Sequence, residues 1–151
     1  MSESSEPTPL ILPFLKPLYT STSDLVDLLF RLLVGLVFVP HGYAKLFVGT
    51  DNFIKFFGNL GLNPPGAFVY FIGSLEFFGG LAIAFGFLTR PLALMLFVNM
   101  TVAAIMVHLP KGWSGPGGAE YVVVLAVISL VLAARGSGRI SVDRLLIGRE
   151  F

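Results

Sequence analysis

The sequence contains no cysteine among its 151 residues, and only 13% of those residues are charged. Without cysteine the chain itself can form no disulfide, bind no iron–sulfur cluster through thiolates and perform no thiol catalysis. About a quarter of the residues in soluble domains are charged, so the shortage of charge argues against an ordinary soluble domain. The formal net charge is only +1, which implies no general affinity for nucleic acid.

Hydrophobic residues instead make up 55% of the chain, a composition typical of integral membrane proteins. The first ten residues, MSESSEPTPL, are acidic and lack the basic region of a secretory signal. We therefore expect the first apolar stretch to be retained as a membrane span. The bilayer is then the first partner that the sequence predicts.

Apolar runs separated by turn residues predict an all-α fold, a transmembrane four-helix bundle. At about 1.5 Å per residue, the first run is long enough to cross a hydrocarbon core of roughly 30 Å. A Ser-, Thr- and Pro-rich tail over residues 1–24 precedes the membrane domain at 25–134, and a basic tail follows at 135–151. The four predicted spans are residues 25–47, 67–88, 91–109 and 118–134.

Two connections have patterns of their own. Phe53, Phe56, Phe57 and Leu60 recur at the spacing of one helix face, which predicts a short amphipathic helix on the membrane or over the bundle. The loop PKGWSGPGGA is rich in glycine and carries Trp113, which we expect to be an interfacial anchor. Both connections lie on the same side of a four-span bundle.

The distribution of basic residues predicts the orientation of the bundle. Four spans place both termini on one side, and an excess of lysine and arginine marks the cytoplasmic side. Both termini are therefore expected to be cytoplasmic. The basic residues expected on that side are Lys16, Arg90, Arg135, Arg139, Arg144 and Arg149, against Lys45, Lys55 and Lys111 on the other.

Polar residues within the spans are costly in a bilayer and therefore suggest a function. Counting along each helix at about 1.5 Å per residue places His41 roughly 9 Å, Lys45 about 3 Å and Glu76 about 14 Å from the outer membrane surface. His108 ends the third span and Glu120 opens the fourth. Every predicted helix thus contributes a titratable group to the outer half of the bundle.

Arg31 is the exception, because it lies closer to the cytoplasmic end of the first span. Asn99 is nine residues from His108, which puts it on the opposite side of an ideal helix and predicts a separate helix–helix contact. Gly73 and Gly80 share a face with Glu76, where small residues allow a neighbouring helix to approach closely.

Glu76 is expected to pair with Lys45, His41 or Arg31, or to be protonated, since hydrocarbon disfavours a lone carboxylate. Each of these polar residues also has a purely structural explanation. The pair can simply fix the helix register, and Arg31 and Lys45 can extend to the two membrane surfaces. The two His and two Glu match no standard ligand spacing, and Lys45 would repel a cation, so we predict no metal site.

Several segments together resemble the DoxX family of small four-helix membrane proteins, over about residues 28–146. The segments are FRLLVGLVFVPHGYAKLF, GLNPPGAFVYFIGSLEFFGGLAIAFGFLTRPLAL, HLPKGW and GGAEYVVVLA. The resemblance implies a four-span bundle in the bacterial cytoplasmic membrane. The family takes its name from a membrane subunit of a thiosulfate:quinone oxidoreductase, and other members are described as quinone-related or as partners in membrane oxidoreductase complexes.

The resemblance and the polar cluster together predict a redox-associated membrane protein that binds a quinone-like or other small hydrophobic molecule near the outer side. We expect His41 and Lys45 to bind or protonate a carbonyl oxygen, and Glu76 to tune their charge or relay a proton. The expected ligand-binding residues are Arg31, which also ties spans together, and His108, Trp113, Glu120 and Tyr121 at the mouth.

The sequence contains no haem or flavin motif, so electrons must come from the ligand or from a redox partner protein. The absence of cysteine likewise assigns any sulfur-carrier role to a partner. Two other functional classes stay open at this point. The chain can be a non-catalytic assembly or anchoring subunit with a structural polar core. It can also be a small-molecule transporter, and because it has only four spans and no repeat, such a transporter would have to work as a homodimer.

Overall fold

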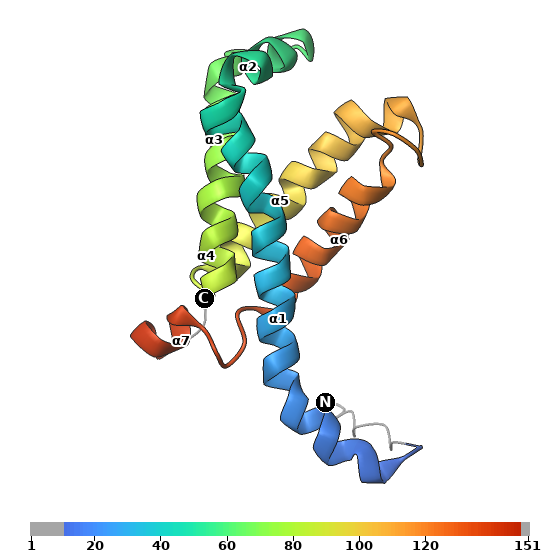
Figure 1. Cartoon of the computed structure of the whole chain (residues 1–151), viewed down its shortest axis with the longest axis vertical. Coiled ribbons are helices and arrows are strands. Elements are labelled where there is room, and N and C mark those ends of the chain that lie inside the picture. The colour runs from blue at the N-terminus through green and yellow to red at the C-terminus, as the bar shows by residue number, and fades with distance from the viewer. Residues whose placement is uncertain (1–10, 149–151) are drawn as a thin grey trace, which may run out of the picture.

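The computed structural model describes residues 11–148, apart from the side chains of residues 15–16, 18–21 and 147. Within that range the regular elements are all helical, and Figure 1 shows them as long rods with short connections. The α-helices are α1 (Lys16–Tyr43), α2 (Thr50–Asn59), α3 (Pro65–Ser74), α4 (Gly80–Phe85), α5 (Thr89–Ala103), α6 (Glu120–Arg135) and α7 (Val142–Ile147). Shorter helical segments are η1 (Pro13–Leu15), η2 (Ala44–Val48), η3 (Leu75–Gly79), η4 (Ala104–His108) and η5 (Leu109–Lys111).

The first hairpin packs α1 and its extension η2 against the continuous rod formed by α3, η3 and α4. Glycines allow this close approach, as the sequence predicted for Gly73 and Gly80. A Cβ at Gly35 would clash with the carbonyl oxygen of Gly80, and a Cβ at Gly42 would clash with the backbone nitrogen of Phe77. The backbones of the two rods are therefore in direct contact, which fixes the depth of every side chain between them.

The second hairpin consists of α5, continued by η4, and of α6, which returns alongside it. The two hairpins share a buried core that includes Phe38 of α1, Ile83 of α4, Leu96 of α5 and Leu125 of α6. Toward the end that carries α2 the hairpins diverge, as Figure 1 shows. The space between the diverging ends contains the candidate site.

Within residues 11–148, two helices are long and apolar enough to cross a membrane, Pro65–Phe85 and Thr89–Lys111. They agree closely with the predicted spans 67–88 and 91–109. The fourth predicted span, 118–134, corresponds to α6. Large apolar side chains are exposed along the outside of both hairpins, among them Leu33, Phe71, Val98 and Val127. Exposed apolar surface of this extent fits contact with lipid.

The two terminal segments differ from the sequence-based expectation. Helix α1 begins at Lys16, within the predicted tail, because Pro17 lies in its first turn, where the missing amide hydrogen has no helical partner to lose. The basic segment after α6 is also structured. It turns back over the end of the bundle and forms α7, whose first turn is capped by Ser141 accepting from the backbone nitrogen of Arg144 at 3.4 Å.

Arg31 holds this C-terminal segment in place. Its guanidinium donates to the carbonyl oxygens of Ala84 at 3.2 Å, of Ile140 at 2.8 Å and of Ser137. The residue is only 2% exposed, and its charge is met by these backbone carbonyls together with the nearby carboxylates of Asp143 and Asp27. Gly86 makes room for it, since a Cβ there would clash with the guanidinium. We call Arg31, Ala84, Ser137 and Ile140 the tail cluster.

Candidate ligand-binding pocket

A cavity of about 270 Å³ lies between the two hairpins, beneath α2. Most of its lining is apolar and includes the ring side chains of Phe53, Phe56 and Phe57 from α2. The predicted amphipathic helix therefore presents its apolar face to a cavity. The polar side chains of the lining are His41, Lys45, Glu76, Asn99, His108 and Tyr121.

An ion pair across the first hairpin forms the polar wall of this cavity. Lys45 Nζ lies 2.5 Å from Glu76 Oε2, and the side chains are 13% and 3% exposed. Asn99 Nδ2 donates to the other carboxylate oxygen, Oε1, at 3.1 Å. Both oxygens of Glu76 thus accept hydrogen bonds, one from each hairpin. We call Lys45, Glu76 and Asn99 the pocket cluster.

The pocket cluster keeps unused hydrogen-bonding capacity. The Lys45 ammonium has three hydrogens. Besides Glu76, its contacts in the part of the chain that the structure describes are a long one of 3.5 Å to the His41 carbonyl oxygen and one to the face of Phe53 at 5.4 Å. The Asn99 amide oxygen accepts no hydrogen bond from the described residues. The wall therefore offers a donor and an acceptor side by side to any molecule in the cavity.

Three π-helical turns position the polar groups. Lys45 lies in η2, Glu76 in η3 and His108 in η4. A π turn inserts about one extra residue into a helix, so every later side chain rotates by roughly 100° relative to an ideal helix. Such turns are common at functional sites, because the irregular backbone re-aims side chains.

Asn99 makes the helix–helix contact that the sequence predicted, because its side chain on α5 donates to Glu76 on η3. The contact is not separate from His108, however. In an ideal helix Asn99 and His108 point in opposite directions. The extra residue of the π turn Ala104–His108 turns His108 back by about 100°, so that both side chains reach the same cavity. Neither the positions of the glycines nor the spacing of the polar residues in the sequence predicts this turn.

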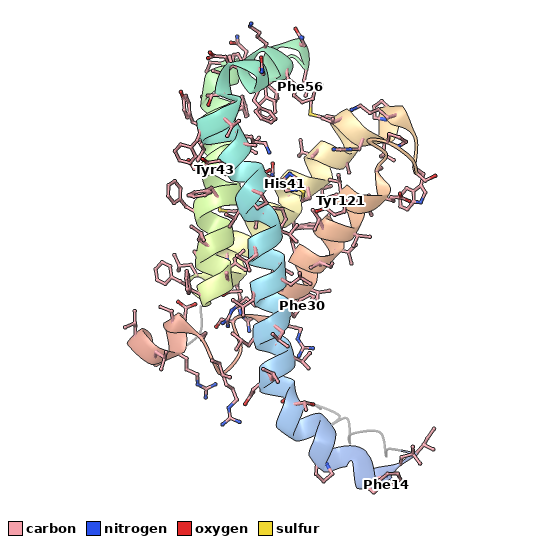
Figure 2. All side chains as sticks on the ribbon, in the orientation of Figure 1. Phe14, Phe30, His41, Tyr43, Phe56 and Tyr121 are labelled. Carbon is pink, nitrogen blue, oxygen red and sulfur yellow. The ribbon has the colours of Figure 1, made fainter. Side chains whose placement is uncertain are left out.

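Two aromatic rings flank the cavity between the hairpins. The rings of His41 on α1 and Tyr121 on α6 have centroids 6.5 Å apart, and Figure 2 shows both side chains in the space between these helices. Both side chains are exposed as well as lining the cavity. His108 Nδ1 lies 2.9 Å from the carbonyl oxygen of Gly117, which ties the glycine-rich loop to the end of η4.

The structure brings together only some of the residues predicted as a site. His41, Lys45, Glu76, His108 and Tyr121 line the cavity. Arg31 lies in the tail cluster at the other end of the bundle, because the C-terminal segment supplies its acceptors. Trp113 and Glu120 are exposed and do not line the cavity, since the loop carries Trp113 away from it and Glu120 occupies the outward side of the first turn of α6.

Among residues 11–148, no three His, Asp or Glu side chains gather closely enough to hold a metal ion. The polar groups of the pocket lining are an ammonium, a carboxylate, an amide, two imidazoles and a phenol. A primary ammonium and an amide can bind an oxygen atom, and two imidazoles and a phenol stand near enough to exchange protons with a bound molecule.

Comparison with known proteins gives the family. The DoxX family model matches residues 26–109. The "Putative oxidoreductase CatD" of Bacillus subtilis (strain 168) is 34% identical over 120 residues, which are 80% of this chain and 86% of that protein. "Inner membrane protein YqjF" of Escherichia coli (strain K12) is 33% identical over 127 residues, 82% of this chain and 93% of that protein.

A third relative is "Inner membrane protein YphA" of Escherichia coli (strain K12), which is 32% identical over 123 residues, 78% of this chain and 87% of that protein. No solved structure matches the chain. The family model covers more than half of the sequence, and the relatives align over most of their length with a chain that has the apolar surface of a membrane protein. The chain belongs to the DoxX family of membrane proteins.

Proposed function

We propose that this chain is a redox-associated membrane protein that binds a quinone-like or other small hydrophobic molecule in the cavity beside the pocket cluster. One observation carries the proposal: a buried ion pair with a spare donor and a neighbouring acceptor faces an otherwise apolar cavity. Ligand sites are typically concave and apolar, with a few polar groups that fix orientation. A purely structural ion pair needs no cavity next to it.

In this proposal a carbonyl oxygen of the ligand accepts a hydrogen bond from Lys45. Reduction of a quinone to a quinol consumes two electrons and two protons, and the developing negative charge on oxygen is stabilised by the ammonium. His41, Lys45 and Glu76 are the catalytic residues, with Glu76 holding the Lys45 ammonium at the cavity wall. His108 and Tyr121 exchange protons with the outside.

The electrons come from a redox partner protein, because the chain has no cysteine and no motif for a haem or a flavin. The relative whose printed name is an oxidoreductase supports a redox role for this chain. We propose in addition that the chain is a subunit of an oxidoreductase complex. Two copies of the chain can also form a homodimer within it.

For the membrane topology we propose a four-span bundle in the bacterial cytoplasmic membrane with both termini in the cytoplasm. Two relatives named as inner membrane proteins support this location. A single cysteine placed at the exposed Leu145 of α7 tests the orientation. It should react with a membrane-impermeant maleimide only after the cells are opened, and labelling of intact spheroplasts would contradict the proposed orientation.

Purification in a mild detergent followed by mass spectrometry of extracted lipids tests the binding function. The wild type should retain a ring-containing lipophilic molecule that is lost from Glu76→Gln and His41→Ala. Glu120→Gln is the matched control, because that carboxylate is exposed and lies outside the cavity. Equal retention by all the variants would refute binding at this site.

A second candidate is a non-catalytic assembly subunit with a structural polar core. The favouring observation is that Glu76 accepts from Lys45 of one hairpin and Asn99 of the other, so it joins the two. In that case Glu76→Gln would lower the unfolding temperature strongly, and no ligand would be recovered from the wild type. The two candidates therefore predict opposite outcomes in the same preparation.

A further inference from the structure

The rim of the cavity has two sides of different chemistry. Five lining side chains are exposed to the outside. His41 and Tyr121 form a polar rim between α1 and α6. On the other side Phe56 of α2, Val102 of α5 and Met106 of η4 form a rim that is entirely apolar.

The apolar rim continues a lipid-facing surface. Val98 and Val102 of α5 and Ile105 of η4 are all exposed and follow one face of the span Thr89–Lys111. A stripe of bare apolar side chains on a membrane-spanning helix faces acyl chains rather than water. Because Val102 belongs both to this stripe and to the cavity lining, it lies at the boundary between the cavity and the lipid-facing surface.

The size of the cavity limits what it can enclose. Its volume of about 270 Å³ is less than twice the ~150 Å³ of a cavity that holds a benzene molecule. It is also below the roughly 300–1,000 Å³ of pockets that enclose drug-sized ligands. One substituted ring fits between the pocket cluster and the rim, but a long apolar chain attached to that ring does not.

We propose that ligands enter the cavity from the bilayer through the apolar rim, and that the natural ligand is a single-ring lipid bearing oxygen. This inference rests on the proposed function. The ring oxygen meets Lys45 and Asn99 at the polar wall, and the apolar tail passes Val102 and remains among the acyl chains. The polar rim at His41 and Tyr121 gives access to water and protons, and to small ring molecules without a tail.

The lack of cysteine allows a clean test in the full chain reconstituted in lipid nanodiscs. Val102→Cys places a unique thiol on the apolar rim, and the matched control Val98→Cys places one on the same stripe outside the cavity. Each thiol is modified after folding with a benzyl methanethiosulfonate, and a reductant later removes the group. Two probes are used, dimethoxy-methyl-benzoquinone with a decyl tail and the same ring without the tail. Uptake and release of each probe are measured by rapid filtration and mass spectrometry.

We expect the benzyl group at residue 102 to slow uptake and release of the tailed probe by about tenfold or more, reversibly. Uptake of the ring without a tail should change by less than about twofold, and modification at residue 98 should affect neither probe. Equal effects at residues 102 and 98, or equal slowing of both probes at residue 102, would overturn the bilayer entrance. Failure of both probes to bind the unmodified protein would instead refute the proposed function.

Discussion

The pocket cluster and the tail cluster both bury a cation within the helices, but they satisfy it in different ways. Arg31 donates to carbonyl oxygens of Ala84, Ser137 and Ile140, which are fixed parts of the backbone. Lys45 is held by a side-chain carboxylate, that of Glu76, and its other contacts within residues 11–148 are the distant His41 carbonyl oxygen and the face of Phe53, beside a cavity. A buried charge surrounded by backbone acceptors maintains the fold, whereas one with spare capacity and space next to it can bind a ligand.

The comparison predicts its largest effect on stability at Arg31. In Arg31→Met three backbone carbonyls lose a charged donor and the C-terminal segment loses its attachment. We expect a loss of about 3–5 kcal/mol in the free energy of unfolding, measured by thermal or denaturant unfolding in detergent. Arg139→Met is the control, because the Arg139 side chain is 71% exposed and its pairing with Asp24 spans 3.7 Å. Similar stabilities for the two variants would show that the tail cluster is not structural.

The next effect concerns the hairpin that carries Lys45 and Glu76. Gly42→Ala would push a methyl group against the backbone of Phe77, and overpacking of this kind costs about 1–3 kcal/mol. The same measurement on Gly66→Ala should show almost no loss, because a Cβ there meets only Ile54 Cδ1 at 3.9 Å. Equal unfolding temperatures for the two variants would contradict the close backbone contact of α1 with α3 and η3.

Glu76→Gln should separate binding from folding. The amide can still accept from Lys45, so we expect a smaller fall in stability than for Arg31→Met, about 1–3 kcal/mol for the lost charge–charge interaction. Binding of the ring probe without a tail should weaken about tenfold or more, as measured by equilibrium filtration. A variant that unfolds as readily as Arg31→Met while binding normally would reverse the roles assigned to the two clusters.

Asn99→Leu should have the smallest effect. It removes one hydrogen bond to Glu76 and the neighbouring acceptor, with a net cost of about 1 kcal/mol in stability. Affinity for the ring probe should fall by roughly three- to tenfold, since one of two contacts is lost. Thr101→Val is the control on the same helix, because the Thr101 hydroxyl donates only to the Phe97 carbonyl oxygen at 2.8 Å. Equal affinities for these two variants would exclude Asn99 from the site.

The sequence predicted a cation for Glu76, because a carboxylate in an apolar span needs a partner, but it left Lys45, His41 and Arg31 open as that partner. The structure selects Lys45. The short amphipathic helix α2 and the glycine contacts of Gly73 and Gly80 were predicted from periodicity and residue size. These features depend on local pattern and on regular helix geometry, which the sequence encodes directly.

Other structural features could not be predicted from the sequence, and the physical reason differs from one feature to the next. The place of His108 beside Asn99 depends on the π turn of η4, which no composition or spacing rule reveals. The acceptors of Arg31 come from Ser137 and Ile140, more than a hundred residues away, in a segment whose polarity suggested a plain tail. Helix α1 begins before the apolar run because its start is set by Pro17 rather than by hydropathy. In each case a long-range contact or an irregular turn overrides the local pattern.

The most direct test of the account is the rise in unfolding temperature produced by the ring probe without a tail. Ligands that bind only the folded state raise this temperature. The wild type and Arg31→Met should both show a clear rise, the latter from a lower starting point, and Glu76→Gln should show almost none. No rise in the wild type, or an equal rise in Glu76→Gln, would contradict the claim that the pocket cluster binds a ligand while the tail cluster only maintains the fold.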